Sequence, residues 1–360
     1  MNDEDTKPAP AVEQSPPANS TMPSGFDPLQ THVTAEWKYT SPLICCRFDQ
    51  QGRYVFSSAE DNHVQRWDFA SGKLTTLEGH DSWVRDIVCV PSGDIVVTVG
   101  SDEQMLFWPA AAEKPQPIRK VKAHQGWIRC ADLSPDSTMI VTGGNDNLVK
   151  LWDASDGTLA QQLAGHESHV YSVLFHPGGE FILSGDLSGQ VKQWEVASGK
   201  LVHSFDAKDL HSYNAGQQVH YGGVRSLSLS PDAKHLACGG LHKASNPLGA
   251  INEPLIVVFD WETQKQVRSH ISEGVRGVIW RSFYLPDGKL LGASGGSGGG
   301  FLLFWNPNED ASFHKFKLKD TIRGLDIHPD HLHLATTHWD RHLRISRMTA
   351  KQPDASKQPS

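Results

Sequence analysis

The stretch WIRCADLSPDSTMIVTGGNDNLVKLWD, residues 127–153, decides the fold of this 360-residue chain. It holds three short runs rich in β-branched and other apolar residues, separated by the turn sequences SPDS and GNDN. Runs of this kind between clusters of Gly, Asn, Asp and Pro are typical of strands joined by hairpins. Residues 31–349 repeat this order of features without a helical period, which predicts an all-β protein.

Three markers recur in phase along this region. The tryptophans that end successive units are spaced by 41, 44 and 42 residues, at Trp67, Trp108, Trp152 and Trp194. A proline-led turn recurs at Pro91, Pro135, Pro177, Pro231, Pro286 and Pro329. A Gly-His or Ala-His pair ends at His80, His124 and His166. A period of 40 to 45 residues with four strands in each unit is typical of a β-propeller.

Together these markers resemble the WD-repeat (WD40) family over residues 31–349. The resemblance implies a seven-bladed β-propeller of four-stranded antiparallel blades. We expect the innermost strands to start near Leu43, Val84, Ile128, Val170, Val224, Val275 and Ile322. The last unit lacks an outermost strand, and THVTAEWK at residues 31–38 has the length and alternation to supply it. The N-terminal strand would then close the ring and remove its exposed sheet edges.

In the family, a His, a Ser or Thr, an Asp and the Trp of each blade form a buried hydrogen-bonded set. Blades two and three match fully, with His80, Thr98, Asp102 and Trp108, and with His124, Thr142, Asp146 and Trp152. Blade four has Ser188 where Asp is expected, blade one lacks the His, and blade seven has Ser346 in place of Trp. Recurrence in phase favours a structural role over a hydrolytic triad.

Composition excludes several classes of protein. No apolar run approaches the ~18 residues of a membrane span, and the amino terminus lacks a secretory signal, so we expect a cytoplasmic protein. A formal charge of −8 argues against nucleic-acid binding. The five scattered cysteines predict neither a disulfide scaffold nor a zinc cluster. The acidic, proline-rich residues 1–30 and the polar residues 350–360 are predicted to be disordered tails.

The second residue of the innermost strand is the candidate binding position. It is arginine in five of the seven aligned units, at Arg85, Arg129, Arg225, Arg276 and Arg323, and Tyr171 or Ile44 in the other two. The resemblance places this position at the mouth of the central channel, with Trp83 and Trp127 beside it. Guanidinium groups suit bidentate binding of carboxylate or phosphate.

Three interpretations of these arginines remain open from the sequence. They bind a specific anionic ligand or peptide, they anchor a less specific protein interface, or they pair with Asp86, Asp132 or Asp326 and pack the channel. Similar arginines bind phosphorylated peptides in the WD-repeat substrate receptors of ubiquitin ligases. Glu60, Ser101 and Asn145 stand where those receptors can carry another arginine, so a phosphodegron receptor is not favoured.

Insertions and histidines are the remaining candidates. Residues 206–223, 241–254 and the Gly-rich 294–300 lengthen connections that the resemblance places on the arginine-bearing face. His331 and His333 alternate and could be metal ligands on one face of a strand, but no Cys or carboxylate repeats with zinc spacing. We therefore expect no metal and no cofactor.

The sequence thus predicts a non-catalytic scaffold that binds a protein or peptide partner, acidic or phosphorylated, on its loop-rich face. The alternative is a propeller enzyme with a metal-dependent or hydrolytic site in the central channel. Five cations suit an anionic partner and would repel a catalytic divalent ion. The partner and the oligomeric state stay open.

Overall fold

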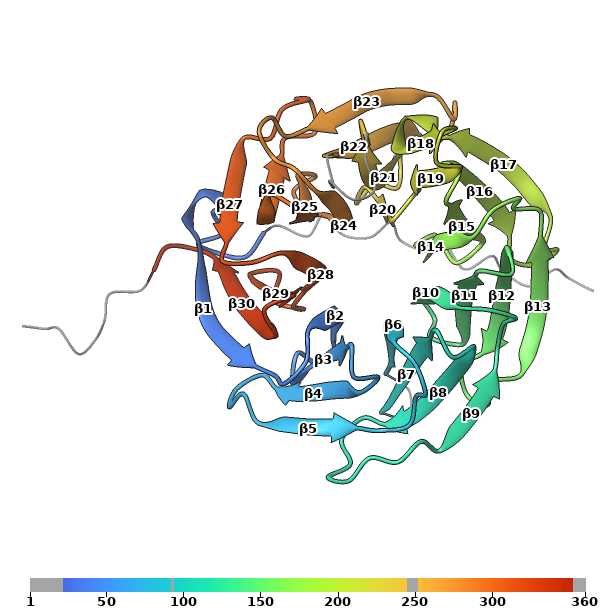
Figure 1. Ribbon diagram of the computed structural model, residues 1–360, viewed down its shortest axis with the longest axis vertical. Coiled ribbons are helices and arrows are strands. Elements are labelled where there is room, and N and C mark those ends of the chain that lie inside the picture. The colour runs from blue at the N-terminus through green and yellow to red at the C-terminus, as the bar shows by residue number, and fades with distance from the viewer. Residues whose placement is uncertain (1–21, 92–93, 245–251, 352–360) are drawn as a thin grey trace, which may run out of the picture.

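The computed structural model describes residues 22–91, 94–244 and 252–351. Seven four-stranded antiparallel sheets stand around a central channel as the blades of a propeller (Figure 1). The predicted all-β, seven-bladed fold is confirmed. Among the described residues the two helices are three-residue 3₁₀ turns, η1 (Pro28–Gln30) and η2 (Lys208–Leu210), and no helix has the length and apolarity to cross a bilayer.

The first four blades follow one another along the chain, each from its innermost to its outermost strand. Blade one comprises β2 (Leu43–Phe48), β3 (Tyr54–Ala59), β4 (Val64–Asp68) and β5 (Leu74–Leu77). Blade two comprises β6 (Val84–Val90), β7 (Ile95–Gly100), β8 (Gln104–Pro109) and β9 (Arg119–Lys122). Blade three comprises β10 (Ile128–Leu133), β11 (Met139–Gly144), β12 (Leu148–Asp153) and β13 (Leu159–Ala164). Blade four comprises β14 (Val170–Phe175), β15 (Phe181–Asp186), β16 (Gln190–Glu195) and β17 (Leu201–Asp206).

A small hairpin separates these blades from the last three; it is formed by β18 (His211–Asn214) and β19 (Val219–Gly222). Blade five comprises β20 (Ser226–Leu229), β21 (His235–His242), β22 (Glu253–Asp260) and β23 (Gln266–Ile271). Blade six comprises β24 (Val278–Tyr284), β25 (Leu290–Gly296), β26 (Gly299–Trp305) and β27 (His314–Leu318). Blade seven comprises β28 (Ile322–Ile327), β29 (His333–His338), β30 (His342–Met348) and β1 (Thr31–Lys38).

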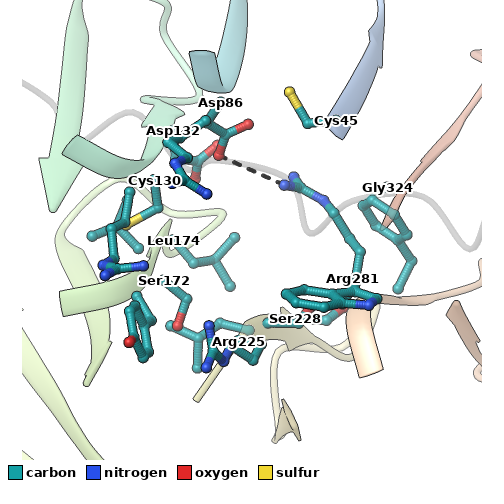
Figure 2. A pocket seen from close by; sticks show the side chains of 18 of the residues that line it. Cys45, Asp86, Cys130, Asp132, Ser172, Leu174, Arg225, Ser228, Arg281 and Gly324 are labelled. Atoms are coloured by element: carbon teal, nitrogen blue, oxygen red, sulfur yellow. Dashed lines mark ion pairs between the residues drawn. The ribbon is translucent and has the colours of Figure 1, made fainter. Parts of the chain in front are cut away.

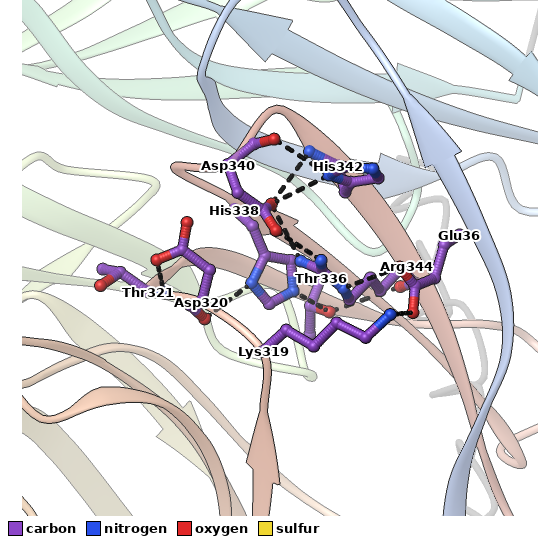
Figure 3. Close-up of polar contacts among 9 residues, drawn as sticks. All are labelled: Glu36, Lys319, Asp320, Thr321, Thr336, His338, Asp340, His342 and Arg344. Atoms are coloured by element: carbon purple, nitrogen blue, oxygen red, sulfur yellow. Dashed lines mark hydrogen bonds and ion pairs between the residues drawn. The ribbon is translucent and has the colours of Figure 1, made fainter.

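Strand β1 closes the ring as predicted. It pairs antiparallel with β30, from Thr31 opposite Met348 to Lys38 opposite His342, and Figure 1 shows the blue and red strands side by side. Polar contacts reinforce the closure (Figure 3). Arg344 of β30 is only 1% exposed; it donates to Asp340 at 3.0 Å and lies 3.6 Å from Glu36 of β1.

The residues just before β1, which the sequence predicts as part of the N-terminal tail, lie against the propeller. Phe26 packs against the hydrophobic cluster of blades six and seven, and the backbone N–H of Asp27 donates to Met348 O at 2.9 Å. The Asp27 carboxylate also accepts from Leu29 N at 2.9 Å, which caps η1. Residues 1–21 and 352–360 lie outside the described residues.

The expected buried sets form in blades two and three. In blade three, His124 contacts Asp146 at 2.8 Å and Thr142 at 2.7 Å, and the Trp152 indole donates to Thr142 Oγ1 at 2.8 Å. In blade two, His80, Thr98, Asp102 and Trp108 make the same contacts. Each hydroxyl thus joins two buried groups that would otherwise be unpaired.

Blade four corrects the sequence interpretation. The carboxylate beside His166 belongs to Asp186, at 2.8 Å, and Ser188 only donates to that carboxylate at 2.7 Å. Asp186 ends β15, where blades two and three have Gly100 and Gly144. A Cβ on Gly144 would lie 2.5 Å from His124 Nδ1, so a blade that pairs this histidine with an Asp on the turn needs glycine there. Blade four carries the carboxylate directly at the end of the strand instead.

Candidate functional site: an arginine-lined channel mouth

A cavity of about 360 Å³ lies in the central channel, lined along its length by the innermost strands of all seven blades (Figure 2). Five of the predicted site residues line it: Arg85, Arg129, Tyr171, Arg225 and Arg323. We call it the channel-mouth cavity. The structure therefore brings together residues that are far apart in the sequence.

A β-bulge explains why these side chains face the channel. In blades two, three, four and seven the register between the first two strands shifts by one residue, and the extra residue is Arg85, Arg129, Tyr171 or Arg323. The extra residue of a bulge has no partner on the neighbouring strand, and the bulge re-aims its side chain. The repeat thus delivers one side chain per blade to the channel mouth.

Arg276 was wrongly aligned with this position. It is exposed and precedes β24, and it does not line the channel-mouth cavity. Innermost strands start as predicted in five blades, but β24 starts at Val278 instead of Val275, and β20 at Ser226 instead of Val224. Gly277 stays in the preceding loop, where its N–H donates to Asn252 O at 3.1 Å.

Trp280 is the bulge residue of blade six, and Arg281 follows it into the cavity. Sequence reasoning missed both, although one signal could have found them. The channel-mouth residue precedes the proline of the next turn by six positions in blades two to five and in blade seven, as in Arg129 and Pro135. The same spacing from Pro286 gives Trp280, whereas Arg276 lies ten positions away.

Arginines and aromatic rings alternate around the mouth. The Arg85 guanidinium lies 5.0 Å from the ring of Trp83 and 4.8 Å from that of Trp127. The Arg129 guanidinium lies 5.2 Å from Trp127 and 4.2 Å from Tyr171. Arg225 continues the series, 4.0 Å from Tyr171 and 5.7 Å from Trp280. Cation–π contacts of this length hold the guanidinium groups in place without neutralising them.

Three of these arginines, Arg85, Arg129 and Arg225, form what we call the arginine trio. Each donates through Nε to a neutral oxygen: Ser101 Oγ at 2.8 Å, Asn145 Oδ1 at 2.5 Å and Gly222 O at 3.0 Å. Within the described ranges no carboxylate lies within 4.0 Å of the trio, whereas Arg323 is 2.7 Å from Glu60. The uncompensated positive charge therefore lies over blades two to five.

The pKa shifts of the arginine trio agree with the absence of a nearby carboxylate. Burial and the charges of Arg129 and Arg323 lower the pKa of Arg85 to about 10. Burial also lowers the pKa of Arg129 and that of Arg225. All three stay charged at pH 7, but their charged forms are poorly compensated within the protein, so a bound anion would stabilise them.

The aspartates named as possible partners of the arginines bind elsewhere. Asp86 forms an ion pair with Arg47 of blade one, deeper in the channel. Asp132 accepts a hydrogen bond from Phe175 N at 2.8 Å and Asp326 from Phe48 N at 2.7 Å, each linking adjacent blades. Burial raises the pKa of both Asp132 and Asp326 to about 6. The predicted pairing of these aspartates with the channel-mouth arginines is absent from the described part of the chain.

The insertions differ from one another. Residues 206–223 fold into η2 and the β18–β19 hairpin, whose last residue, Gly222, holds Arg225. The Gly-rich segment is not a projecting loop, because β25 and β26 pair up to Gly296 opposite Gly299. Part of 241–254, residues 245–251, lies outside the described residues.

The histidine-rich segment does not share one strand face. His331 lies in the turn before β29, with a φ of 56°, and His333 instead lies near His328 and Asp330. His328 Nε2 contacts Gly52 O at 3.2 Å, and the His333 ring contacts Asp330 at 2.6 Å. These contacts account for the cluster as a hydrogen-bonded turn, at the opposite end of β28 from Arg323.

Comparison with known proteins agrees with the architecture. The family model described as "WD domain, G-beta repeat" matches residues 29–68, 71–109, 115–153, 157–195 and 312–345, more than half of the chain. A nuclear distribution protein nudF 2 of Talaromyces marneffei is 29% identical over 91 residues, 25% of this chain and 19% of that protein. A nuclear distribution protein PAC1 of Yarrowia lipolytica is 36% identical over 55 residues, 15% of this chain and 13% of that protein.

A bromodomain and WD repeat-containing protein of Dictyostelium discoideum is 26% identical over 98 residues, 27% of this chain and 4% of that protein. The matched part of the chain thus spans about a fifth or less of the length of these curated relatives. The likeness to these proteins extends over 55 to 98 residues of this chain.

Proposed function

The chain belongs to the WD-repeat family, and from this premise we propose that it is a non-catalytic scaffold that binds a protein partner at the channel-mouth cavity. The partner presents an acidic or phosphorylated peptide segment. The predicted site residues Arg85, Arg129, Tyr171, Arg225, Arg323, Trp83 and Trp127 contact it, and Arg276 does not. The names of the relatives, nuclear distribution proteins and a bromodomain protein, are consistent with a role in protein assembly.

The observation that carries the proposal is the arginine trio. These three buried or half-buried cations donate to neutral oxygens and lack a carboxylate partner among the described residues. Placing like charges together costs free energy unless a counter-charge arrives. A carboxylate or phosphoryl group in the cavity supplies that charge and accepts from the guanidinium groups, and each such bond contributes about 1.5–3 kcal/mol.

The surface around the cavity supports a peptide rather than a free ion as the partner. Trp83 and Trp127 are 37% and 42% exposed, and Trp339, 5.2 Å from the Arg323 guanidinium, is 52% exposed. Exposed tryptophan beside arginine is the composition of interface hot spots. The anionic group would occupy the cavity while the rest of the segment covers these indoles.

The test is a pull-down followed by partner identification, with wild type and two charge-reversal variants. Arg129→Glu combined with Arg225→Glu reverses charge inside the cavity, and Arg276→Glu is the matched control outside it. We expect the double variant to lose its partners and the control to retain them, with binding that weakens as salt rises. Unchanged partners for a folded double variant would contradict the proposal.

A further inference from the structure

Arg281 is a charged residue inside the channel that plays no part in the blade interiors described above. It lies one residue after the bulge of blade six and lines both the channel-mouth cavity and the next cavity down the channel. Figure 2 shows it extended across the cavity from β24 towards Asp86 of β6. Its side chain remains 30% exposed, and its guanidinium lies 5.3 Å from the ring of Phe283 in the same strand.

The contact between Arg281 and Asp86 is weak. Its Nη1 is 3.8 Å from Asp86 Oδ2, beyond the length of a hydrogen bond. Asp86 is already satisfied by other groups: the Arg47 guanidinium, Ile87 N at 2.9 Å and Ala131 N at 3.2 Å. Arg281 makes no hydrogen bond to the described residues through its guanidinium. It is therefore a surplus cation inside the channel.

A second unpaired group lies at the same place. The indole Nε1 of Trp280 is buried and has no hydrogen-bond partner in the described part of the chain. A buried donor without a partner is unfavourable, and an acceptor that reached this nitrogen would satisfy it. Blade six thus brings an unused guanidinium and the ring of Trp280 to the cavity lined by the arginine trio.

We infer that the channel-mouth cavity takes a compact oxyanionic group inside the channel and that Arg281 is its deepest ligand. On binding, the Arg281 guanidinium moves away from Asp86 and donates to the anion from inside the channel. The arginine trio donates to the same anion from the channel mouth. Asp86 remains neutralised by Arg47. This inference rests on the proposed function and deepens it, because it makes blade six, with Trp280 and Arg281, a specificity element that selects anions small enough to enter.

The cavity volume and the donor types limit the chemistry of the group. A space of about 360 Å³ accommodates a carboxylate-bearing or phosphorylated side chain, and arginine binds both in a bidentate manner. The two sources share an oxyanion, and they differ in charge and in the number of acceptor oxygens. Inorganic phosphate and glutarate are therefore the probes that separate them.

The experiment titrates each probe into the full chain at constant ionic strength and follows the thermal unfolding midpoint and tryptophan fluorescence. A ligand that binds only the folded state raises the midpoint in a saturable way. The variants are Arg281→Gln, Arg129→Gln and, as the matched control outside the cavity, Arg276→Gln. We expect Arg276→Gln to bind like wild type. We expect Arg281→Gln and Arg129→Gln each to bind about tenfold more weakly, which is the effect of losing ~1.4 kcal/mol.

Two outcomes overturn the inference. Wild-type affinity in Arg281→Gln, with weakened binding in Arg129→Gln, would remove Arg281 from the site and leave the proposed function intact. No saturable binding of either probe to wild type would remove the compact-anion site, while the pull-down still decides the proposed function. Without probe, Arg281→Gln should unfold within a few degrees of wild type, because Asp86 keeps its other partners; this separates a binding role from a structural one.

Discussion

Blades two to four and blades five and six have the same four-stranded sheets but different interiors. The family model matches the first group and stops between residues 195 and 312, where the second group lies. Blade three is built around a polar set in which Thr142 joins His124 to Trp152. In blade five the corresponding positions hold Cys238 and Phe259, both buried and apolar.

Blade six keeps a buried tryptophan but pairs its indole differently from blade three. Trp305 stands at the usual place, but Gly292 occupies the threonine position, and a Cβ there would lie 3.1 Å from the indole ring. The Trp305 indole therefore donates to Ile271 O of blade five at 2.8 Å. A buried indole needs an acceptor, and a backbone carbonyl serves as well as a hydroxyl.

The difference shows that a blade can form without the buried His–Ser/Thr–Asp–Trp set, because its buried polar groups can be paired in other ways or replaced by apolar residues. What all blades share is a second strand that is buried along nearly its whole length, and the apolar clusters run from one blade into the next. Burial of apolar side chains is common to all blades. Where the polar set is present, each of its members must also be hydrogen-bonded. Four experiments break or sharpen this comparison.

The largest effect is expected from Asp186→Ala in blade four. This buried carboxylate pairs with His166 and also accepts from Ser188 and Gln190 N–H groups at 2.9 and 3.0 Å. Its removal leaves several buried donors unpaired, and we expect a loss of about 3 kcal/mol or more in the free energy of unfolding, measured in urea. Ser188→Ala is the control, with a loss of about 1 kcal/mol or less. Equal losses would contradict the assignment of Asp186 as the acidic member of the set in blade four.

Next come two substitutions with opposite chemistry at equivalent positions. Thr142→Val removes the hydroxyl that Trp152 and His124 share, and we expect it to cost about 2–3 kcal/mol. Cys238→Ser replaces a buried thiol by a hydroxyl within the apolar cluster that contains Phe259, and we expect it to cost about 1–2 kcal/mol. A neutral result for both in urea unfolding would mean that the two interiors do not differ in polarity.

A pH effect of about 2 kcal/mol should distinguish blade five. His270 is buried and donates to Glu309 O at 2.8 Å, and burial lowers its pKa to about 4. Its ordinary pKa is 6.5, so the unfolded chain binds a proton first, and stability is lost as the pH falls from 6.5 towards 4. In blade three, burial also lowers the pKa of His124, but the Asp146 carboxylate opposes that shift. The Asp146 carboxyl itself, with a pKa of about 2, loses its contribution only below pH 3.8.

The variant His270→Gln keeps a donor for Glu309 O but does not titrate. Between pH 7 and pH 5 it should therefore lose about 2 kcal/mol less stability than wild type in urea unfolding. Hydrogen exchange at pH 5 should show blades five and six opening before blade three. Parallel pH profiles for wild type and His270→Gln would assign the acid sensitivity to other groups.

The smallest effect on the free energy of unfolding is expected from an exposed ion pair on the surface of blade two. Lys122 of β9 lies 2.9 Å from Glu103 and is 66% exposed, so water screens the pair. Lys122→Ala should change the free energy of unfolding by less than about 0.5 kcal/mol. A larger loss would mean that exposed ion pairs, and not buried polar sets, separate blades two to four from blades five and six.

Most of the fold could be predicted because its signals are local. Strand alternation and proline-led turns lie within one repeat, and the tryptophans mark how the repeats follow one another. Residues 31–38 were predicted as the closing strand from their length and alternation and from the way the family closes its ring. The candidate site was predicted where this local phase held, at Arg85, Arg129, Tyr171, Arg225 and Arg323. The prediction was wrong at Arg276. The pair Val275–Arg276 resembles the start of the other innermost strands, but it lies four residues before Trp280, the bulge residue of blade six.

The sequence by itself determined the number of blades, the closing strand and the type of side chain offered to the channel. Only the tertiary structure decided which charges are compensated. Arg323 meets Glu60, Asp86 meets Arg47, and Arg281 reaches across the channel, while the arginine trio meets no carboxylate in the described chain. Strand identity depends on neighbours in the chain, whereas an ion pair depends on atoms brought within a few ångströms by closing the ring, and no local pattern encodes that distance.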